Sequence, residues 1–549
     1  MTTPGTTKRR RGARQLVAVV LALAVSAAGA AAAQTPAIGA AGPPAAKTHS
    51  SRPEGVAWFE GDPAAAFALA QSTQRQVLLY WGAVWCPPCQ ELKATIFKRP
   101  DFLDRLKLFI PVYLDGDAPG AQAWGERFHV SGYPTLLVLR ADQTELERVS
   151  GGMDLSRYAE VLDLALGQDR PVRELLAAVA GQEAMADPDD CRRLAYNAWW
   201  LDDDWLSHPE SLEALAAQLD RAAQRCAPVP GVERARLQLT AVHAAVRAQA
   251  KELGAGKPAD AQLRALVRPV PRILADGELA LQLGDVLCAM PAEFFPAAAA
   301  AYGRPGKPGK DALRARWILI MNQLAADPRY SASDRLDAVR SKLLAAKALG
   351  VDGKIATPLA AAVTRRIDDE LARERDPYAR ASLVNSALNL LDVLGDDARA
   401  HAILDGEIRT AEHPYYYMED MGELEEKLGH ADLAVDWLAR SYQSAQGPAT
   451  RFQWGVSYVQ GLLRMHPQEE TAIRSAALSV LGELDAADDL HGRNLRSLRR
   501  LEAALREWNR DASHDAAIGE LRARVQSICG RLAPGDSSRP ACAAFLAKA

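Results

Sequence analysis

The stretch YWGAVWCPPCQELK, from Tyr80 to Lys93, decides the fold of the first ordered part of this chain. It places two cysteines, Cys86 and Cys89, on either side of two prolines, and Trp85 comes directly before the first of them. A cysteine pair at this spacing can bind a metal, form a structural crosslink or exchange electrons. The residues around the pair favour one of these alternatives.

The segments on either side of the pair predict a strand followed by a helix. QVLLYWG (76–82) is apolar and β-branched, which is typical of a short buried strand. CQELKATIF places Leu92 and Ile96 four residues apart, which is the spacing of one helix face. Cys86 is therefore expected at the N-terminus of a helix, where free N–H groups and the helix dipole favour a thiolate.

Two other interpretations of the cysteine pair fit the sequence less well. A structural zinc site needs a second ligand pair at short spacing, but no second C-x₂-C exists and the ten histidines are scattered. A purely structural disulfide across two residues closes a small loop and stabilises little. We expect no metal site, and we interpret Cys86 and Cys89 as a redox pair.

Further apolar segments complete an α/β domain, which we place at residues 53–168. KLFIPVYLD (107–115), PTLLVLR (134–140) and TELERVS (144–150) predict three more strands. The segment 154–167 predicts a closing helix that Asp154 caps and Gly167 ends.

The segment before one of these strands carries a family resemblance. Gly132-Tyr133-Pro134-Thr135, taken with Trp85 and the cysteine pair, resembles the thioredoxin family, in which W-C-x-x-C lies beside a cis-proline. The resemblance implies a central mixed sheet flanked by helices, with Cys86 as nucleophile and Cys89 as resolving thiol. It also implies that Trp85, Tyr133, Pro134 and Thr135 bind the substrate chain, with Pro134 as the cis-proline. The motif is most similar to extracytoplasmic branches, such as the periplasmic domain of the transmembrane disulfide reductase.

One departure from the family concerns proton transfer. Many thioredoxins have a buried carboxylate six residues before the first cysteine, and this chain has Tyr80 there. Glu91 is the nearest carboxylate in sequence, so it is a candidate proton relay that would act through water. The alternative is that Glu91 is an ordinary solvated helix residue.

The N-terminus predicts export. Basic residues between Lys8 and Arg14 precede an uncharged, Ala-rich run, and the pattern is that of a signal peptide over residues 1–33. If it is not cleaved, the same run would tether the protein to a membrane. Residues 34–52 are rich in Pro, Ala, Gly and Ser, which is typical of a disordered linker. We expect a periplasmic or secreted protein, in a compartment that permits disulfides.

The chain has seven cysteines, so five remain outside the motif. Their spacing cannot fix the connectivity, but proximity in sequence favours the pairs Cys191–Cys226 and Cys529–Cys542. Cys288, in an apolar segment, is interpreted as a buried inert thiol.

Residues 171–549 predict an all-helical region, because amphipathic stretches alternate with Pro and Gly breakers and no strand pattern is evident. LGDDARAHAIL (394–404) and LGHADLAVDWL (428–438) match at an offset of 34 residues, which resembles tetratricopeptide (TPR) repeats. We expect a TPR-like solenoid around 377–485; a generic helical bundle is the alternative. The run Tyr415–Tyr417 is interpreted as packing between repeats.

These observations predict a thiol–disulfide oxidoreductase that acts on protein disulfides. It needs no small-molecule cofactor, because the Cys86–Cys89 disulfide is itself the redox group. Pro87 and Pro88 offer no N–H to the sulfur, so we expect a reductase or a weak oxidant.

The expected partners are client proteins with disulfides or thiols and an upstream redox protein. The net charge of −4 argues against nucleic acid. The alternative function is an interaction scaffold with helical repeats and a docking thioredoxin fold.

Overall fold

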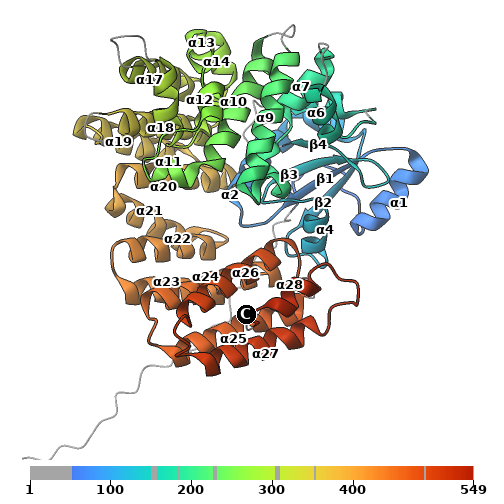
Figure 1. Ribbon diagram of the computed structural model, residues 1–549, viewed down its shortest axis with the longest axis vertical. Coiled ribbons are helices and arrows are strands. Elements are labelled where there is room, and N and C mark those ends of the chain that lie inside the picture. Colours follow the sequence, from blue (N-terminus) through green and yellow to red (C-terminus); the bar gives the residue numbers. More distant parts are fainter. Residues whose placement is uncertain are drawn as a thin grey trace, which may run out of the picture. The chain divides into compact units, whose positions relative to one another are not determined.

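The computed structural model describes residues 52–149, 158–167, 169–181, 186–226, 231–302, 309–350, 354–487 and 490–547. The predicted signal peptide, and the predicted linker except for Arg52, lie outside these residues. The residues from Ser50 onward pack as one compact unit. We call residues 52–167 the α/β part and residues 169–547 the helical part (Figure 1).

The α/β part contains a mixed four-stranded sheet in the order β2-β1-β3-β4. β1 pairs in parallel with β2 and antiparallel with β3, and β3 pairs antiparallel with β4. The mixed sheet and its flanking helices confirm the predicted fold class. The elements of this part are α1 (Pro63–Thr73), β1 (Val77–Gly82), α2 (Pro87–Ala94), η1 (Ile96–Lys98), α3 (Pro100–Leu106), β2 (Ile110–Asp115), α4 (Ala121–Arg127), β3 (Thr135–Leu139), β4 (Glu145–Val149) and α5 (Tyr158–Ala165).

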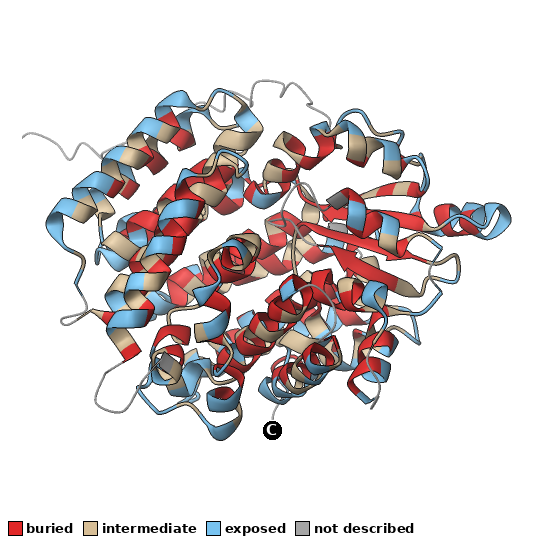
Figure 2. Ribbon diagram, turned by 90° about the horizontal axis from the view of Figure 1, so that it is seen from above, coloured by how far each residue is buried: buried red, intermediate tan, exposed pale blue. Residues whose placement is uncertain are grey.

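The central strand β1 is buried on both faces, which explains why its sequence is continuously apolar. Leu78 and Tyr80 pack into one hydrophobic cluster, and Leu79 and Trp81 pack into another on the opposite face. Figure 2 shows this burial along the strands.

Three short helices of the α/β part were not predicted. α1, α3 and α4 lack a long amphipathic period. Residues 107–109 form the turn that follows α3, so that β2 begins at Ile110 and is shorter than the strand expected at 107–115. The first four residues of the helix expected at 154–167 lie outside the described residues, and the described part is α5.

After β4, the described residues contain helices and no further strand, as predicted. An isolated bridge joins Val130 to Asp202. The elements of the helical part are α6 (Val172–Gly181), α7 (Pro188–Tyr196), η3 (Trp199–Leu201), α8 (Asp203–Leu206), α9 (Pro209–Arg225), α10 (Gly231–Ala248), α11 (Ala250–Gly254), α12 (Ala261–Leu266), α13 (Val270–Ala275), α14 (Gly277–Gln282), α15 (Gly284–Cys288), α16 (Phe294–Tyr302), α17 (Gly309–Ala326), α18 (Ala332–Leu349), α19 (Thr357–Arg373), α20 (Pro377–Leu394), α21 (Asp397–Thr410), α22 (Pro414–Lys427), α23 (Ala431–Ser444), α24 (Pro448–Met465), α25 (Glu470–Ala487), α26 (Gly492–Trp508), α27 (Asp515–Cys529) and α28 (Arg539–Ala544).

The two matching sequence segments of the predicted repeats occupy equivalent places in the helical part. Each begins at the end of one helix and continues into the next, from α20 into α21 and from α22 into α23. Their glycines, Gly395 and Gly429, have φ angles of 70° and 83°, a conformation that ends a helix and suits glycine. This arrangement is consistent with a TPR-like region, while a solenoid over 377–485 stays a prediction.

Two disulfides lie in the helical part, and both pairings favoured by sequence proximity are confirmed. Cys191 on α7 is bonded to Cys226 at the end of α9, and Cys529 on α27 is bonded to Cys542 on α28. Cys288 is a free cysteine, and burial raises the pKa of its thiol. No helix in the described part of the chain has the length and apolar character needed to cross a bilayer.

Candidate functional site

The cysteine pair lies where β1 leads into α2. Cys86 is the N-cap residue of α2 and forms a disulfide with Cys89 in the first turn. Pro87 and Pro88 have no N–H, and the N–H of Gln90 donates to the carbonyl of Cys86 at 3.1 Å. The N–H of Cys89 donates to Cys86 Sγ at 3.2 Å. One backbone donor of this turn therefore still reaches the sulfur despite the two prolines.

The predicted proline lies beside the cysteines. The Tyr133–Pro134 peptide bond is cis, and Pro134 directly precedes β3, whose Thr135 pairs with Trp81 near the end of β1. This register brings Tyr133 into one hydrophobic cluster with Cys86 and its neighbours. Among the described residues, no hydrogen bond involves the backbone N–H or C=O of Tyr133. Thr135 is buried and donates its hydroxyl to the carbonyl of Gly132 at 2.8 Å, so it orders the turn before β3.

Trp85 contacts the helical part of the chain. Its Nε1 donates to Thr450 Oγ1 on α24 at 2.9 Å. Its ring meets the ring of Trp454 edge-on, with centroids 4.6 Å apart, and stacks with Tyr416 of α22 at 6.0 Å. Tyr133 packs against the same indole at 5.9 Å. The aromatic side chain beside the disulfide is thus held between the two parts of the molecule.

The α/β part also caps two helices of the helical part. Neither α24 nor α26 has a capping side chain of its own. Asp117, after β2, accepts hydrogen bonds from the N–H and the hydroxyl of Thr450, at 2.8 and 2.5 Å. Glu126 and Gln122 on α4 accept from the N–H groups of Gly492 and Arg493, at 3.0 and 3.1 Å. These bonds satisfy N–H groups that have no partner within their own helix.

The capping carboxylates differ in their electrostatic environments. Burial raises the pKa of Asp117 to about 6, although the hydrogen bonds from Thr450 act in the opposite direction. The hydrogen bond with His491 lowers the pKa of Glu126 to about 2, with further bonds from Gly492 and Ser537. Glu126 therefore caps α26 as a carboxylate at neutral pH.

Two arginines of α26 extend this interface to the segment that carries the cis bond. The guanidinium of Arg493 lies over the ring of Tyr133, 4.7 Å from its centroid. Arg496 donates to the carbonyl of Ser131 at 3.1 Å and pairs with Asp203 at 2.9 Å. The face of the α/β part that carries the cysteines and Tyr133 is consequently covered, with Cys86 only 3% exposed and Cys89 fully buried.

The residues that cover the cysteines were not identified from the sequence. Thr450 and Trp454 belong to no recognisable motif, and they meet Trp85 only because the chain folds back. Tyr416 lies in the run that was interpreted as repeat packing. Its neighbour Tyr415 does pack among helices, but Tyr416 reaches Trp85.

Comparison with known proteins bears on the α/β part. A family described as "Thioredoxin-like domain" matches residues 63–166, the segment that carries the mixed sheet, the disulfide and the cis-proline. Residues 63–166 form a thioredoxin-like domain.

Curated relatives match the same part of the chain. The protein named "Thiol:disulfide interchange protein DsbD" from Klebsiella pneumoniae is 32% identical over 96 residues, which are 17% of this chain and 16% of the relative. Its namesake from Photorhabdus laumondii is 29% identical over 98 residues, 17% of each chain. That from Haemophilus influenzae strain PittGG is 28% identical over 102 residues, 18% of each chain. This chain therefore spans about a sixth of the length of the curated relatives it matches.

The thioredoxin-like domain has no carboxylate directly behind the cysteines on β1. Tyr80 occupies that position, is fully buried, and packs against Trp58 and Phe97. Its hydroxyl has no hydrogen-bond partner among the described residues. Burial raises the pKa of Tyr80, so its hydroxyl stays protonated at neutral pH.

Glu91 is half-buried and faces the helical part. Burial and, to a smaller extent, Asp334 raise its pKa to about 7, against the opposing effect of hydrogen bonds with Ser331 and Ser382. Glu91 thus lies in a partly enclosed polar contact between α2 and the helices α18 and α20. Its role as a proton relay stays a prediction.

The environment of Glu91 predicts a pH dependence of stability. The pKa in the folded protein is raised above the value of about 4.3 in an unfolded chain, so folding favours the protonated form. Its contribution to stability is full below about pH 4 and is lost as the pH rises through 7. We expect Glu91→Gln to raise the free energy of unfolding at pH 8 relative to wild type, and to change it little at pH 4.5.

Chemical denaturation at the two pH values measures this effect. Glu469→Gln is the control, because Glu469 is exposed in the loop before α25 and should leave the pH dependence unchanged. The same pH dependence in Glu91→Gln and wild type would contradict the expectation.

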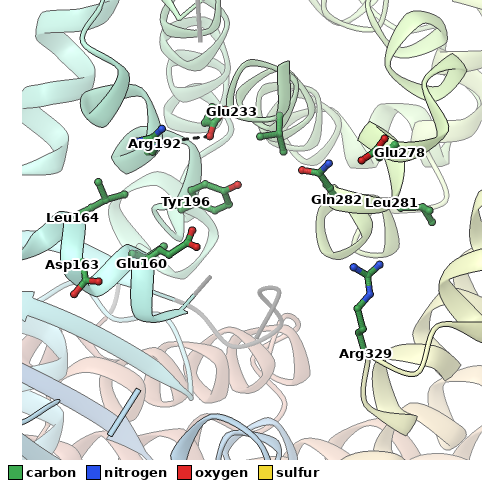
Figure 3. Close-up of a pocket in the computed structure, with 12 residues that line it drawn as sticks. Glu160, Asp163, Leu164, Arg192, Tyr196, Glu233, Glu278, Leu281, Gln282 and Arg329 are labelled. Carbon is green, nitrogen blue, oxygen red and sulfur yellow. Dashed lines mark ion pairs between the residues drawn. The ribbon is translucent and has the colours of Figure 1, made fainter. Parts of the chain in front are cut away.

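A cavity of about 880 Å³ lies away from the cysteines (Figure 3). It is lined by residues of α5, α7, α10 and α14 and by Arg329, and Arg192 pairs with Glu233 at its wall, 3.8 Å apart. None of the predicted site residues lines it. The candidate site is instead a packed surface around the disulfide.

Proposed function

We propose that this chain is an extracytoplasmic thiol–disulfide oxidoreductase that acts on protein disulfides as a reductase. The observation that carries the proposal is the Cys86–Cys89 disulfide at the N-terminus of α2, beside the cis Tyr133–Pro134 bond. The thioredoxin-like domain and the relatives named as disulfide interchange proteins support it. The predicted signal peptide supports the extracytoplasmic location.

In the reducing direction, the Cys86 thiolate attacks one sulfur of a client disulfide, and the other client sulfur leaves as a thiolate and takes up a proton. The Cys89 thiolate then attacks Cys86 Sγ and releases the second client thiol. Two electrons pass from the cysteine pair to the client, and an upstream redox protein must return them. No further cofactor takes part, because the sulfur atoms carry the electrons.

The hydrogen bonds around Cys86 support the reducing direction. A strong oxidant needs a well-stabilised thiolate. Here Pro87 and Pro88 remove two first-turn donors, and the Cys89 N–H is the backbone donor that reaches Sγ. The client chain would bind along Trp85 and Tyr133 when the helices that cover them move away, since the backbone of Tyr133 forms no hydrogen bond within the described residues and can pair with an extended peptide.

The reduction potential of the Cys86–Cys89 pair tests both the function and its direction. The mature protein is equilibrated with glutathione or dithiothreitol buffers, and free thiols are trapped. We expect a value near that of thioredoxin, about −270 mV. A value towards about −120 mV would make the protein an oxidant and reverse the direction.

A second candidate function is an interaction scaffold in which the thioredoxin-like domain only docks. The observation that favours it is the cover over Cys86, which is 3% exposed beneath α22, α24 and α26. The same titration separates the two functions, because a scaffold would show no reversible redox transition of this pair.

A further inference from the structure

A groove of about 420 Å³ lies between α20, α21 and α22. Its lining includes the apolar side chains of Leu388 and Leu424. Asn385 and Asn389, four residues apart on α20, contribute two carboxamides from one face of the helix. The Oδ1 of Asn385 accepts a hydrogen bond from the hydroxyl of Tyr416 at 3.1 Å. Apolar contacts beside carboxamides suit an extended peptide, whose backbone needs hydrogen-bond partners.

Asp420 of α22 is the unusual residue of this groove. Its side chain lines the groove and is surrounded by protein atoms, yet it remains partly accessible. It forms no hydrogen bond or ion pair with any residue in the described ranges. Burial, followed by the neighbouring acidic groups of Glu419 and Glu423, raises its pKa well above the usual range, which favours its protonated form. Asp420 is therefore a half-buried acid that pairs with no cation among the described residues.

The one cationic side chain among the residues that line the groove, Lys427, is already paired. Lys427 binds Asp392 at 2.9 Å and Asp397 at 2.8 Å, at the rim of the groove. The lining thus holds four acidic side chains, those of Asp392, Asp397, Asp420 and Glu423, and one ammonium group. This excess of acidic groups over basic ones favours the binding of a positively charged side chain from another polypeptide.

The groove adjoins the redox site through Tyr416. This residue lines the groove, and its ring stacks on Trp85, which directly precedes Cys86. A peptide in the groove therefore lies against one of the side chains that cover the disulfide.

We propose that this groove binds the polypeptide of a disulfide-containing client through a lysine or arginine side chain that pairs with Asp420. The inference rests on the proposed function, because it assigns the client class of that same site. It places the basic residue of the client in the groove and the neighbouring chain beside Tyr416 and Trp85. Pairing with a cation stabilises the charged form of Asp420, which burial disfavours, through a charge-assisted hydrogen bond.

Peptide binding tests the inference without any redox step. The probe is a fluorescein-labelled peptide of about ten residues that carries one arginine flanked by leucines. Its partner carries citrulline, which keeps the shape of arginine but has no charge. The protein is the full chain with Cys86→Ser and Cys89→Ser, so that no covalent bond can form. We expect fluorescence anisotropy to give about tenfold tighter binding of the arginine peptide.

Asp420→Asn should remove this preference, so that the two peptides bind equally. Glu469→Gln is the matched control: it removes one carboxylate from an exposed loop and should keep the preference. Equal binding of both peptides by the Asp420-containing protein would overturn the inference, as would an unchanged preference in Asp420→Asn. Because Asp420 has no partner to lose, we expect the variant to fold. Should it not fold, Glu423→Gln on the exposed rim must reduce the preference by about threefold.

The two proposals can fail separately. If the cysteine pair shows no reversible transition but the arginine preference holds, the redox function fails and the groove remains a peptide site. If the pair titrates normally and the preference is absent, the inference about the groove fails alone.

Discussion

Cys86→Ser is expected to abolish disulfide exchange, lowering the rate by more than ~1000-fold to that of the uncatalysed reaction. A serine hydroxyl at the N-cap of α2 is not ionised near neutral pH and cannot attack a disulfide. Cys89→Ser should instead leave the attack intact and accumulate a mixed disulfide between Cys86 and the client, because the resolving thiol is absent. The measurement is the rate of reduction of a disulfide-bonded model protein, with trapped intermediates separated on non-reducing gels.

The chain offers a matched control for these variants. Cys288 is a free cysteine, and burial raises the pKa of its thiol. Cys288→Ser makes the same chemical change away from the site and should leave the rate unchanged. Activity that survives in Cys86→Ser, or that is lost in Cys288→Ser, would show that a different thiol carries the reaction.

Gly447→Ala is expected to uncover the disulfide and to raise its rate of reduction by dithiothreitol about tenfold. Gly447 is the N-cap residue of α24, with a φ of 87°. A Cβ at this position would lie 2.2 Å from Cγ of Asp117. The added methyl group must displace the Asp117 carboxylate, which breaks the hydrogen bonds that this carboxylate accepts from Thr450 and so removes the cap of α24. Loss of a helix cap costs about 0.5–2 kcal/mol, and 1.4 kcal/mol corresponds to a tenfold change in the open population.

Gly429→Ala is the comparison variant, because it also places an alanine at a positive φ. Gly429 has a φ of 83°, and a Cβ there would meet no atom within 4 Å. Both alanines take a positive φ, which strains an L-residue. The strain is larger at Gly447, whose ψ is 143°, and only Gly447→Ala also brings a Cβ against Asp117. Reduction is followed by trapping the thiols of the 86–89 pair. Equal rates in both variants would mean that the contact between α24 and Asp117 does not limit access to the disulfide.

The parts of the site that could be predicted are those that short segments determine. The strand before Cys86 is buried on both faces, so its sequence is continuously apolar, and the helix after it starts at the cysteine motif. The cis-proline was predicted at Pro134 from the resemblance of its segment to the thioredoxin family. The pairing of Trp81 with Thr135 explains why Pro134 lies beside the disulfide. The sequences of short helices such as α1 and α4 show no long amphipathic period, so these helices were not predicted.

The cover over the cysteines could not be predicted, because it depends on pairs far apart in the chain. Nothing near Thr450 marks it as the partner of Trp85, and the cap that Asp117 supplies to α24 is visible only once the two segments meet. Glu91 illustrates the same limit. Its sequence neighbours suggest a solvated helix face, but Ser331 and Ser382 of the helical part lie against it.

The separation of 365 residues between Trp85 and Thr450 has a consequence for the newborn chain. At ~5–20 residues per second, the ribosome completes the segment around Thr450 roughly 20–70 s after Trp85. The cysteine motif therefore exists for that time without its cover. Any enzyme that sets the first oxidation state of Cys86 and Cys89 has its best access in this interval, before the last fifth of the polypeptide has been made.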